Sequence, residues 1–274
     1  MAYSSSHRGG RCLVIPERLV PGTSSWELYQ VEHKQRYEWA SKYCRDERVL
    51  DVACGIGYGS AILALHGANH VVGLDISPEA IAFGTKEYQA SNLLLRTGDA
   101  CNLPFDDSMF DVVVSFETIE HLKDPERLLA EISRVLKPEG RCICSSPNRD
   151  FVPSSGHKEA NPFHFSEMSY AEFDQLFSRY FDVSERFSQT HSEAYLRHLE
   201  LFRELDQRLK PIRFSRLLRI ENKIRRLLGR NGLEVIEALP ERVARATPGD
   251  YIIEPLYETS QNLLTLIFVG RKRS

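Results

Sequence analysis

Short apolar runs alternate along the chain with longer segments in which apolar residues recur at helical spacing. A short apolar run bounded by turn-forming residues predicts a buried strand, and the longer periodic segments predict amphipathic helices. Strands that alternate with helices typically form a parallel sheet with helices on both of its faces. The expected strands lie at about 49–53, 70–75, 93–97, 111–116 and 141–146.

The pattern changes after the fifth strand. Residues 148–169 are rich in turn formers and predict a long loop near the carboxyl edge of the sheet. A helix is expected at 169–181, a sixth strand at 182–189 and a last strand at 262–272. The residues between these last two strands show apolar positions at helical spacing, and a structureless loop of that length is uncommon in a compact domain. We therefore expect helices in this insertion.

These elements divide the chain into four parts. The N-terminal part contains a polar arm up to about residue 24 and a helix from Ser25 to Arg45. We expect this arm and helix within 1–48, the core within 49–188, a helical insertion within 189–260 and the final core strand within 261–274.

The first strand, its loop and the second strand carry the most informative sequence of the chain. Residues 49–60 read VLDVACGIGYGS, which predicts a strand, a loop with glycines at every second position and the start of a helix. The second strand ends on Asp75, an acid placed to accept hydrogen bonds from a ribose. This order is typical of a nucleoside-binding βαβ unit.

Two cofactor classes compete for this unit. The motif for nicotinamide dinucleotides has three glycines, and Ser60 stands at its third position. Asp51, four residues before Gly55, would repel a pyrophosphate and favours a cation. S-adenosylmethionine carries an ammonium and a sulfonium and no phosphate, so the charge pattern favours it over a nicotinamide dinucleotide.

Residues 51–59, DVACGIGYG, resemble motif I of the class I S-adenosylmethionine-dependent methyltransferases. Three later motifs resemble the same family in the same order, at Gly98-Asp99-Ala100, from Phe110-Asp111 to His121, and at Lys137-Pro138-Glu139-Gly140. The likeness covers about 28–188 and 262–271 and is greatest to the branch that methylates small molecules. It implies an α/β fold with a doubly wound, Rossmann-like, mostly parallel seven-stranded sheet whose last strand is antiparallel. It also implies S-adenosylmethionine as cofactor and S-adenosylhomocysteine as product.

The resemblance assigns roles to the residues of a predicted cofactor site. Asp51 would orient the methionyl ammonium, and backbone carbonyls around Ala53 and Phe116 would accept from it. Further contacts are expected from the backbone of Gly55 and Gly57 to the methionyl part and ribose, from Asp75 to the ribose hydroxyls, from Ile76 to the adenine, and from Asp99 and Ala100 to the adenine edge. In relatives the N-terminal helix folds over the cofactor as a lid. Tyr29, His33 or Arg36 would then contact the methionyl carboxylate, unless they form a solvated polar face.

Candidate catalytic residues follow the fourth strand, where the transferred methyl group should lie. His121 is a candidate base for an acceptor hydroxyl because an imidazole titrates near neutral pH, and otherwise it and Glu120 are structural. Glu117 is expected to orient a polar acceptor, and His164 in the following loop is a second candidate base. The fourth strand lacks the Asn/Asp-Pro-Pro-aromatic run of nucleic-acid amino-methyltransferases, which argues against DNA amino methylation.

Composition narrows the class of protein further. The 274 residues are 42% hydrophobic and 27% charged with a net charge of −3, which is ordinary for a soluble globular protein and no sign of nucleic-acid binding. The sequence has no apolar run suited to a signal peptide or a membrane span, and its six cysteines form no CxxC pair. We therefore expect a reduced, cytoplasmic protein without a metal site, in which Cys142 and Cys144 are small core residues.

One segment of the expected insertion is strongly basic. Residues 208–230 contain nine Lys or Arg and one acid, so their charge is +8 and that of the remainder is −11. This basic segment is either a solvated helix face or a surface for an anionic acceptor or a membrane.

Together these features predict a methyltransferase that acts on a small molecule or a glycan, at oxygen rather than at nitrogen. A protein that binds S-adenosylmethionine without turnover and an NAD-dependent oxidoreductase are the alternatives.

Overall fold

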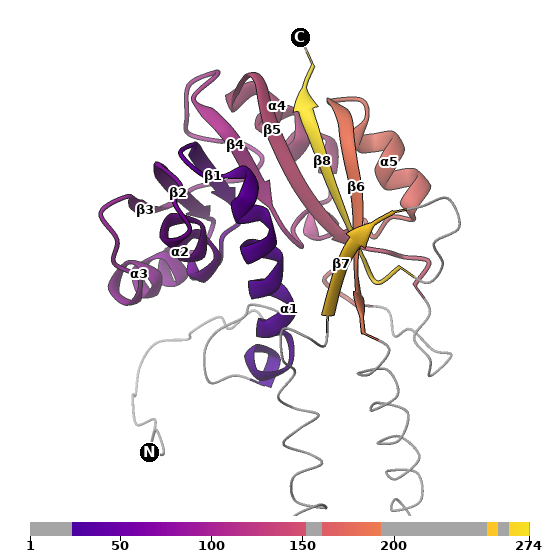
Figure 1. Cartoon of the computed structure of the whole chain (residues 1–274), viewed down its shortest axis with the longest axis horizontal. Coiled ribbons are helices and arrows are strands. Elements are labelled where there is room, and N and C mark those ends of the chain that lie inside the picture. Colours follow the sequence, from indigo (N-terminus) through magenta and orange to yellow (C-terminus); the bar gives the residue numbers. More distant parts are fainter. Residues whose placement is uncertain (1–23, 152–160, 193–250, 257–262, 274) are drawn as a thin grey trace, which may run out of the picture.

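The computed structural model describes residues 24–151, 161–192, 251–256 and 263–273, which form a single mixed sheet with helices on both faces (Figure 1). The strands are β1 (Arg48–Val52), β2 (His70–Asp75), β3 (Leu93–Thr97), β4 (Phe110–Ser115), β5 (Leu136–Pro147), β6 (Phe181–His191), β7 (Tyr251–Pro255) and β8 (Thr265–Lys272). The helices are α1 (Ser24–Ala40), α2 (Tyr58–Leu65), α3 (Pro78–Glu87), α4 (Pro125–Val135) and α5 (Tyr170–Phe177), with short 3-10 turns η1 (Ser41–Tyr43) and η2 (Ile119–His121).

The sheet is doubly wound, as the sequence predicted. Its strand order is β3-β2-β1-β4-β5-β8-β6-β7, and the pairs among β1 to β5 are parallel. β8 lies between β5 and β6 and is antiparallel to both, which confirms the expected antiparallel last strand. The order reverses at β1, so a crevice is expected where β1 and β4 end side by side.

A strand that the sequence analysis did not expect completes the sheet. β7 pairs antiparallel with β6, so the sheet has eight strands and the expected seven was one too few. β6 continues to His191, past the expected boundary at 189, and β7 lies within the range expected to be a helical insertion. Its first residue, Tyr251, is buried, which explains why this short apolar run joins the sheet. The rest of the expected insertion, including the basic segment 208–230, lies outside the described residues.

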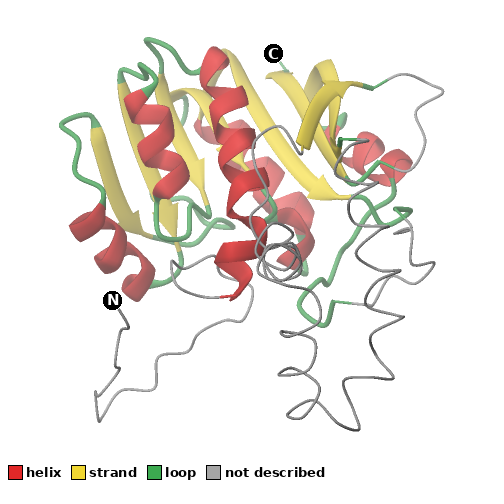
Figure 2. Cartoon of the chain, turned by 60° about the horizontal axis from the view of Figure 1, so that its bottom comes forward, coloured by secondary structure: helices red, strands yellow, loops and turns green. Residues whose placement is uncertain are grey.

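Successive side chains of a strand point to opposite faces, so the sheet separates two hydrophobic cores. On β1, Leu50 and Val52 belong to the core that also contains residues of α4 and α5. Val49 belongs to the other core, together with residues of α1, α2 and α3. Figure 2 shows these helices on the two sides of the sheet. Asp51 alternates with Leu50 and therefore shares the face of Val49, beneath α1 and α2.

Local sequence explains where the helices begin and end. Ser77 and Asp124 cap α3 and α4, because each side chain accepts from a backbone N–H of the first turn and a proline follows it. The N-terminal helix ends at Ala40 and not at the expected Arg45, since η1 follows it directly.

Two sequence-based expectations concern membranes and cysteines. Within the described residues, helices long and apolar enough to cross a membrane are absent. The described cysteines are free thiols, and Cys142 and Cys144 are fully buried core residues as expected.

Candidate cofactor site and active site

A cleft of about 400 Å³ opens where β1, β2 and β4 end, at the reversal of strand order. It is lined by His33, Tyr37, Ala53, Cys54, Gly55, Tyr58, Leu74, Asp75, Ile76, Gly98, Asp99, Ala100, Phe116, Glu117, Thr118, His121, Leu122, Phe163 and Phe165. Among these lining residues, all from the described part of the chain, there is no lysine or arginine. The cleft is therefore suited to an uncharged or cationic ligand and not to a pyrophosphate.

The glycine loop after β1 is held by Asp75 at the end of β2. One carboxylate oxygen accepts from the backbone N–H of Gly55 at 2.9 Å, and the other accepts from the N–H of Ser77 at 2.9 Å. Gly57 caps α2 with a φ of 82°, a conformation that glycine adopts without strain. A side chain at Gly55 would meet no protein atom within 4 Å, so the space beside this backbone is open.

Asp51 lies beneath the loop and not in the cleft lining. Its side chain is fully buried and accepts from the Tyr37 hydroxyl at 3.0 Å and from the Ser60 hydroxyl at 2.6 Å. Burial raises the pKa of this carboxyl from 3.8 to about 7, although the two hydroxyl donors oppose the rise. Tyr37 does line the cleft, so Asp51 can reach a ligand only through neighbouring groups.

Most residues predicted for the adenosine half of the site line this cleft together. Ile76 is 66% exposed, so its side chain offers an apolar surface at the cleft. Asp99 accepts from the backbone N–H of Cys101 at 2.8 Å, and Asp99 and Ala100 both line the cleft. Gly57 is not among the lining residues, and the side chain of Leu95 fills the space beside its Cα.

The predicted contacts from α1 are only partly present. His33 lines the cleft, and burial lowers the pKa of its imidazole well below 6.5. Arg36 does not line the cleft, because its guanidinium is buried and ion-paired with Glu117, 2.9 Å from Nη1 to Oε1. The side chain of Tyr29 lies outside the described residues. Tyr37 also lines the cleft, although the sequence analysis did not assign it to the cofactor site. Its position one helical turn after His33 indicates that the two side chains share a face of α1.

Glu117 is fixed in a strained backbone conformation at the end of β4. Its φ is 48°, which is uncommon for a residue other than glycine. The Ser145 hydroxyl donates to its Oε1 at 2.7 Å, and Arg36 pairs with the same oxygen. Arg36 in turn donates from Nε to Gln189 Oε1 at 2.7 Å, which connects α1 to β6. Sequence reasoning missed Ser145 and Gln189, since neither belongs to a recognisable motif.

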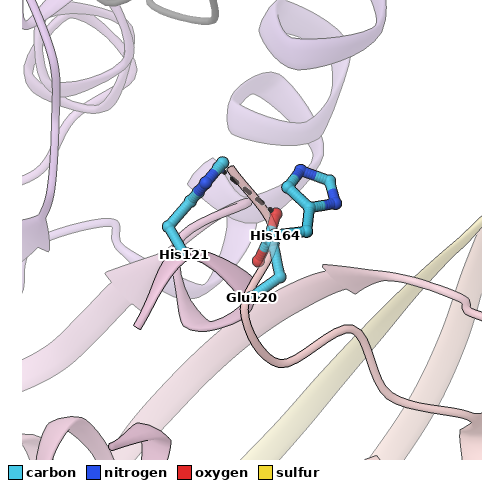
Figure 3. A group of neighbouring side chains, drawn as sticks. All are labelled: Glu120, His121 and His164. Atoms are coloured by element: carbon cyan, nitrogen blue, oxygen red, sulfur yellow. Dashed lines mark ion pairs between the residues drawn. The ribbon is translucent and has the colours of Figure 1, made fainter. Parts of the chain in front are cut away.

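Glu120, His121 and His164 meet where η2 contacts the loop after β5 (Figure 3). His121 lines the cleft, and its Nδ1 lies 3.1 Å from the Phe163 carbonyl. A carbonyl only accepts, so Nδ1 carries the hydrogen and Nε2 the lone pair in the neutral ring. His164 is absent from the cleft lining, and its Nδ1 lies 2.7 Å from Glu167 Oε1.

Glu120 occupies the buried centre of this group. It is 1% exposed, and burial raises the pKa of its carboxyl well above 4.5. Its Oε1 lies 3.9 Å from His121 Nε2, and its Oε2 is buried without a hydrogen-bond partner among the described residues. Its backbone carbonyl accepts from the N–H groups of Phe165 and Ser166, which ties the loop to η2.

These features fit S-adenosylmethionine. Asp75 accepts from two backbone N–H groups and lines the cleft, so its carboxylate is held where the ribose hydroxyls of a bound cofactor would lie. The lining combines an apolar cover at Ile76 and Phe116 with carboxylates, which suits an adenine ring and a cationic methionyl group.

Comparison with known proteins agrees with this assignment. Residues 50–144 match the family model described as a methyltransferase domain. A Mycolicibacterium smegmatis protein, named as a probable S-adenosylmethionine-dependent methyltransferase, is 34% identical over 160 residues, 58% of this chain and 61% of that protein. The ubiquinone biosynthesis O-methyltransferase of Coxiella burnetii is 37% identical over 143 residues, 46% of this chain and 61% of that protein. The chain thus spans 61% of the length of each of these two relatives.

Solved structures share the fold at low sequence identity. An S-adenosylmethionine-dependent methyltransferase from Thermotoga maritima is similar with a TM-score of 0.58 and 15% identity, covering 90% of this chain and 94% of that one. The [4+2]-cyclase SpnF is similar with a TM-score of 0.54 and 18% identity, covering 88% of this chain and 80% of that one. Likeness at such identities establishes the fold alone. Residues 50–144 and the cleft are therefore similar to the methyltransferase domain of the class I S-adenosylmethionine-dependent enzymes, and the comparisons support S-adenosylmethionine as cofactor.

Proposed function

We propose that the chain transfers a methyl group from S-adenosylmethionine to an oxygen atom of a small-molecule or glycan acceptor. When bound, the cofactor supplies an electrophilic methyl group on a sulfonium. The residues of this chain then have to bind both reactants, orient them, exclude water and accept a proton from the acceptor hydroxyl. The oxidoreductase alternative is disfavoured because the described cleft-lining residues include no lysine or arginine that could pair with a pyrophosphate.

Cofactor binding falls to residues at the ends of β1, β2 and β3. Asp75 is assigned to the ribose hydroxyls, and Ile76 and Asp99 to the adenine, because all three line the same cleft. The methionyl end is assigned to the side of the cleft formed by Tyr37 and Phe116. Tyr37 lines the cleft and its hydroxyl donates to Asp51, so this side chain connects the methionyl end of the cleft to the buried carboxyl.

One observation carries the assignment to oxygen. His121 lies in the cleft lining with its Nδ1 hydrogen directed at a backbone carbonyl, which leaves Nε2 as the proton acceptor. A hydroxyl becomes a competent nucleophile when a positioned base takes its proton, whereas a neutral amine needs no such step before attack. An imidazole lone pair on the acceptor side therefore favours a hydroxyl acceptor.

The acceptor side of the cleft is aromatic. Phe163 and Phe165 come from the loop after β5, line the cleft, and remain 38% and 60% exposed. Large exposed apolar side chains at a cleft favour a ligand with an apolar or ring-shaped part. Two relatives are named as a ubiquinone biosynthesis O-methyltransferase, from Coxiella burnetii, and as a phthiotriol/phenolphthiotriol dimycocerosates methyltransferase, from Mycobacterium leprae, the latter 44% identical over 96 residues. An anionic acceptor or a membrane contact through the basic segment 208–230 remains part of the proposal on sequence grounds alone.

The test is a labelled transfer reaction. Purified protein is incubated with S-adenosylmethionine carrying a deuterated methyl group and with fractionated cell extract, and labelled products are identified by mass spectrometry and NMR. We expect the label on oxygen. His121→Ala should lower turnover by about 10²–10⁴ while cofactor affinity by calorimetry stays close to that of the wild type.

Two outcomes would overturn the proposal. A label on nitrogen or carbon would refute the assignment to oxygen. Cofactor binding without a labelled product in any fraction would instead favour the alternative of a catalytically inactive S-adenosylmethionine-binding protein.

A further inference from the structure

The group formed by Glu120, His121 and His164 has the composition of a metal site. We propose that these three side chains bind one divalent transition-metal ion, such as Zn²⁺, at the acceptor side of the cleft (Figure 3). The sequence analysis expected no metal site because the cysteines form no CxxC pair. That argument does not apply to a site built from histidines and a carboxylate.

The ligand set matches known chemistry of such ions. Two imidazoles and one carboxylate, with further positions open, bind Zn²⁺ in catalytic sites and other first-row divalent ions in the facial arrangement. One potential ligand atom from each residue lies within 4.8 Å of the others. Tetrahedral ligand atoms about 2.1 Å from an ion lie about 3.4 Å from one another. Each pair of ligand atoms therefore has to approach by about 1.4 Å or less to bind the ion.

The outer contacts orient both rings as metal ligands require. His121 Nδ1 faces the Phe163 carbonyl at 3.1 Å, and His164 Nδ1 faces Glu167 Oε1 at 2.7 Å. Metal-bound histidines almost always donate their other ring N–H to a carbonyl or a carboxylate in this way. In both rings the lone pair is therefore on Nε2. His164 Nε2 also accepts from the Asn161 amide at 3.0 Å, and an ion would replace that contact.

A second observation points independently to a cation. Glu120 is 1% exposed, and its Oε2 is buried without a hydrogen-bond partner among the described residues. A buried carboxylate oxygen in that condition is costly unless a donor or a metal ion satisfies it. With an ion bound, Glu120 would be ionised, and together with Glu167 it would supply two negative charges to balance a divalent ion.

The metal would change the chemistry assigned to His121, a consequence that rests on the proposed function. Coordination takes the Nε2 lone pair, so the imidazole would no longer serve as the base. A metal ion held by these residues would lower the pKa of an acceptor hydroxyl, which would then lose its proton to solvent near neutral pH and become nucleophilic.

The test uses the full chain without an affinity tag, treated with a chelator and then freed of it. Calorimetric titration with Zn²⁺ should give one ion per chain, and titration with Co²⁺ should give the visible absorption of a site of low coordination number. His164→Ala and Glu120→Gln should each weaken Zn²⁺ binding on the order of 100-fold, and Glu167→Gln about 10- to 100-fold. His66→Ala removes the exposed histidine that follows α2 and whose Nδ1 contacts the Ile62 carbonyl; it is the matched control and should leave binding unchanged.

Folding and cofactor binding are measured in the same samples. Circular dichroism and S-adenosylmethionine affinity should be retained in His164→Ala, because His164 does not line the cofactor cleft. Retained affinity for the cofactor together with lost Zn²⁺ binding supports the site. Absence of Zn²⁺ binding at micromolar concentration, or binding that survives both His164→Ala and Glu120→Gln, would overturn it whether or not a methylated product is found.

Discussion

The buried carboxylate of Asp51 provides a sharp test of how the cleft favours a cation. Its pKa is raised from 3.8 to about 7 because the side chain is fully buried. A carboxyl with a raised folded-state pKa contributes stability that is fully present below the unfolded value and is lost as pH rises toward the folded value. For a pKa that changes from 3.8 in the unfolded chain to about 7 in the folded chain, the free energy of unfolding falls by about 4 kcal/mol in total as pH rises. About 2–3 kcal/mol of this decrease occurs above pH 5.

Asp51→Asn removes this titration and keeps the shape of the side chain. The Tyr37 and Ser60 hydroxyls can donate to the remaining oxygen or accept from the new amide. Relative to the wild type, the free energy of unfolding of the variant should therefore rise by about 2–3 kcal/mol between pH 5 and pH 8.5. Other buried acids, such as Glu32, whose pKa is raised to about 7, titrate in both proteins and cancel in this difference.

Cofactor affinity should respond in the opposite sense. Cationic S-adenosylmethionine stabilises the ionised form of Asp51, so wild-type affinity should increase as pH rises from 6 to 8, by at most tenfold per pH unit. The variant should bind more weakly at pH 8 and lose most of this dependence, while titration of the ligand amino group affects both proteins alike. Urea denaturation and calorimetry measure the two quantities. A stability difference that is the same at both pH values, or equal affinity of both proteins at pH 8, would refute the reasoning.

Three further predictions concern the loop, its packing and the basic segment. Asp75→Ala should weaken S-adenosylmethionine binding about tenfold to a hundredfold in calorimetry, because it removes the charged acceptors of the ribose hydrogen bonds. Asp106→Ala at the surface is the control, and equal affinities of the two variants would contradict the assignment of Asp75 to the ribose. Gly59→Ala should lower the free energy of unfolding by about 1–3 kcal/mol despite the better helix propensity of alanine, because its methyl group would overlap the ring of Tyr37; an unchanged denaturation midpoint would argue against that packing. Binding of anionic liposomes through residues 208–230 should fall steeply between 0.1 M and 1 M salt in co-sedimentation, and salt-independent binding would exclude an electrostatic contact.

The core was predictable because its signals are local. Alternating apolar runs and helical periodicity gave β1 to β4 within one residue, whereas β5 begins at Leu136, five residues before the expected start at 141. The order of motifs indicated which strand ends meet. The burial of Asp51 could also have been predicted from the sequence. Successive residues of a strand point to opposite faces, and Val49 on the same face contacts residues of α1 and α2, so burial of Asp51 followed from its position.

Other parts depend on contacts between distant segments. β7 is five residues long and pairs with a strand about 60 residues earlier, so its short apolar run carried no information about its partner. The roles of Arg36 and Gln189 depend on α1 crossing the sheet close to β6, which periodicity does not specify. His121 and His164 were singled out separately as candidate bases, and their meeting around the buried Glu120 depends on the path of a loop.

The same buried contacts change the expected role of the N-terminal helix. A lid must separate from the core, whereas Arg36 is fully buried and connects α1 to β4 through Glu117 and to β6 through Gln189. Tyr37 of the same turn is buried against the glycine loop and lines the cleft. Separation of this part of α1 would leave the carboxylate of Glu117 without its cation and Asp51 without a hydroxyl donor. From residue 33 onward the helix is therefore a fixed wall of the cofactor site, and substitutions there should reduce stability and cofactor affinity together.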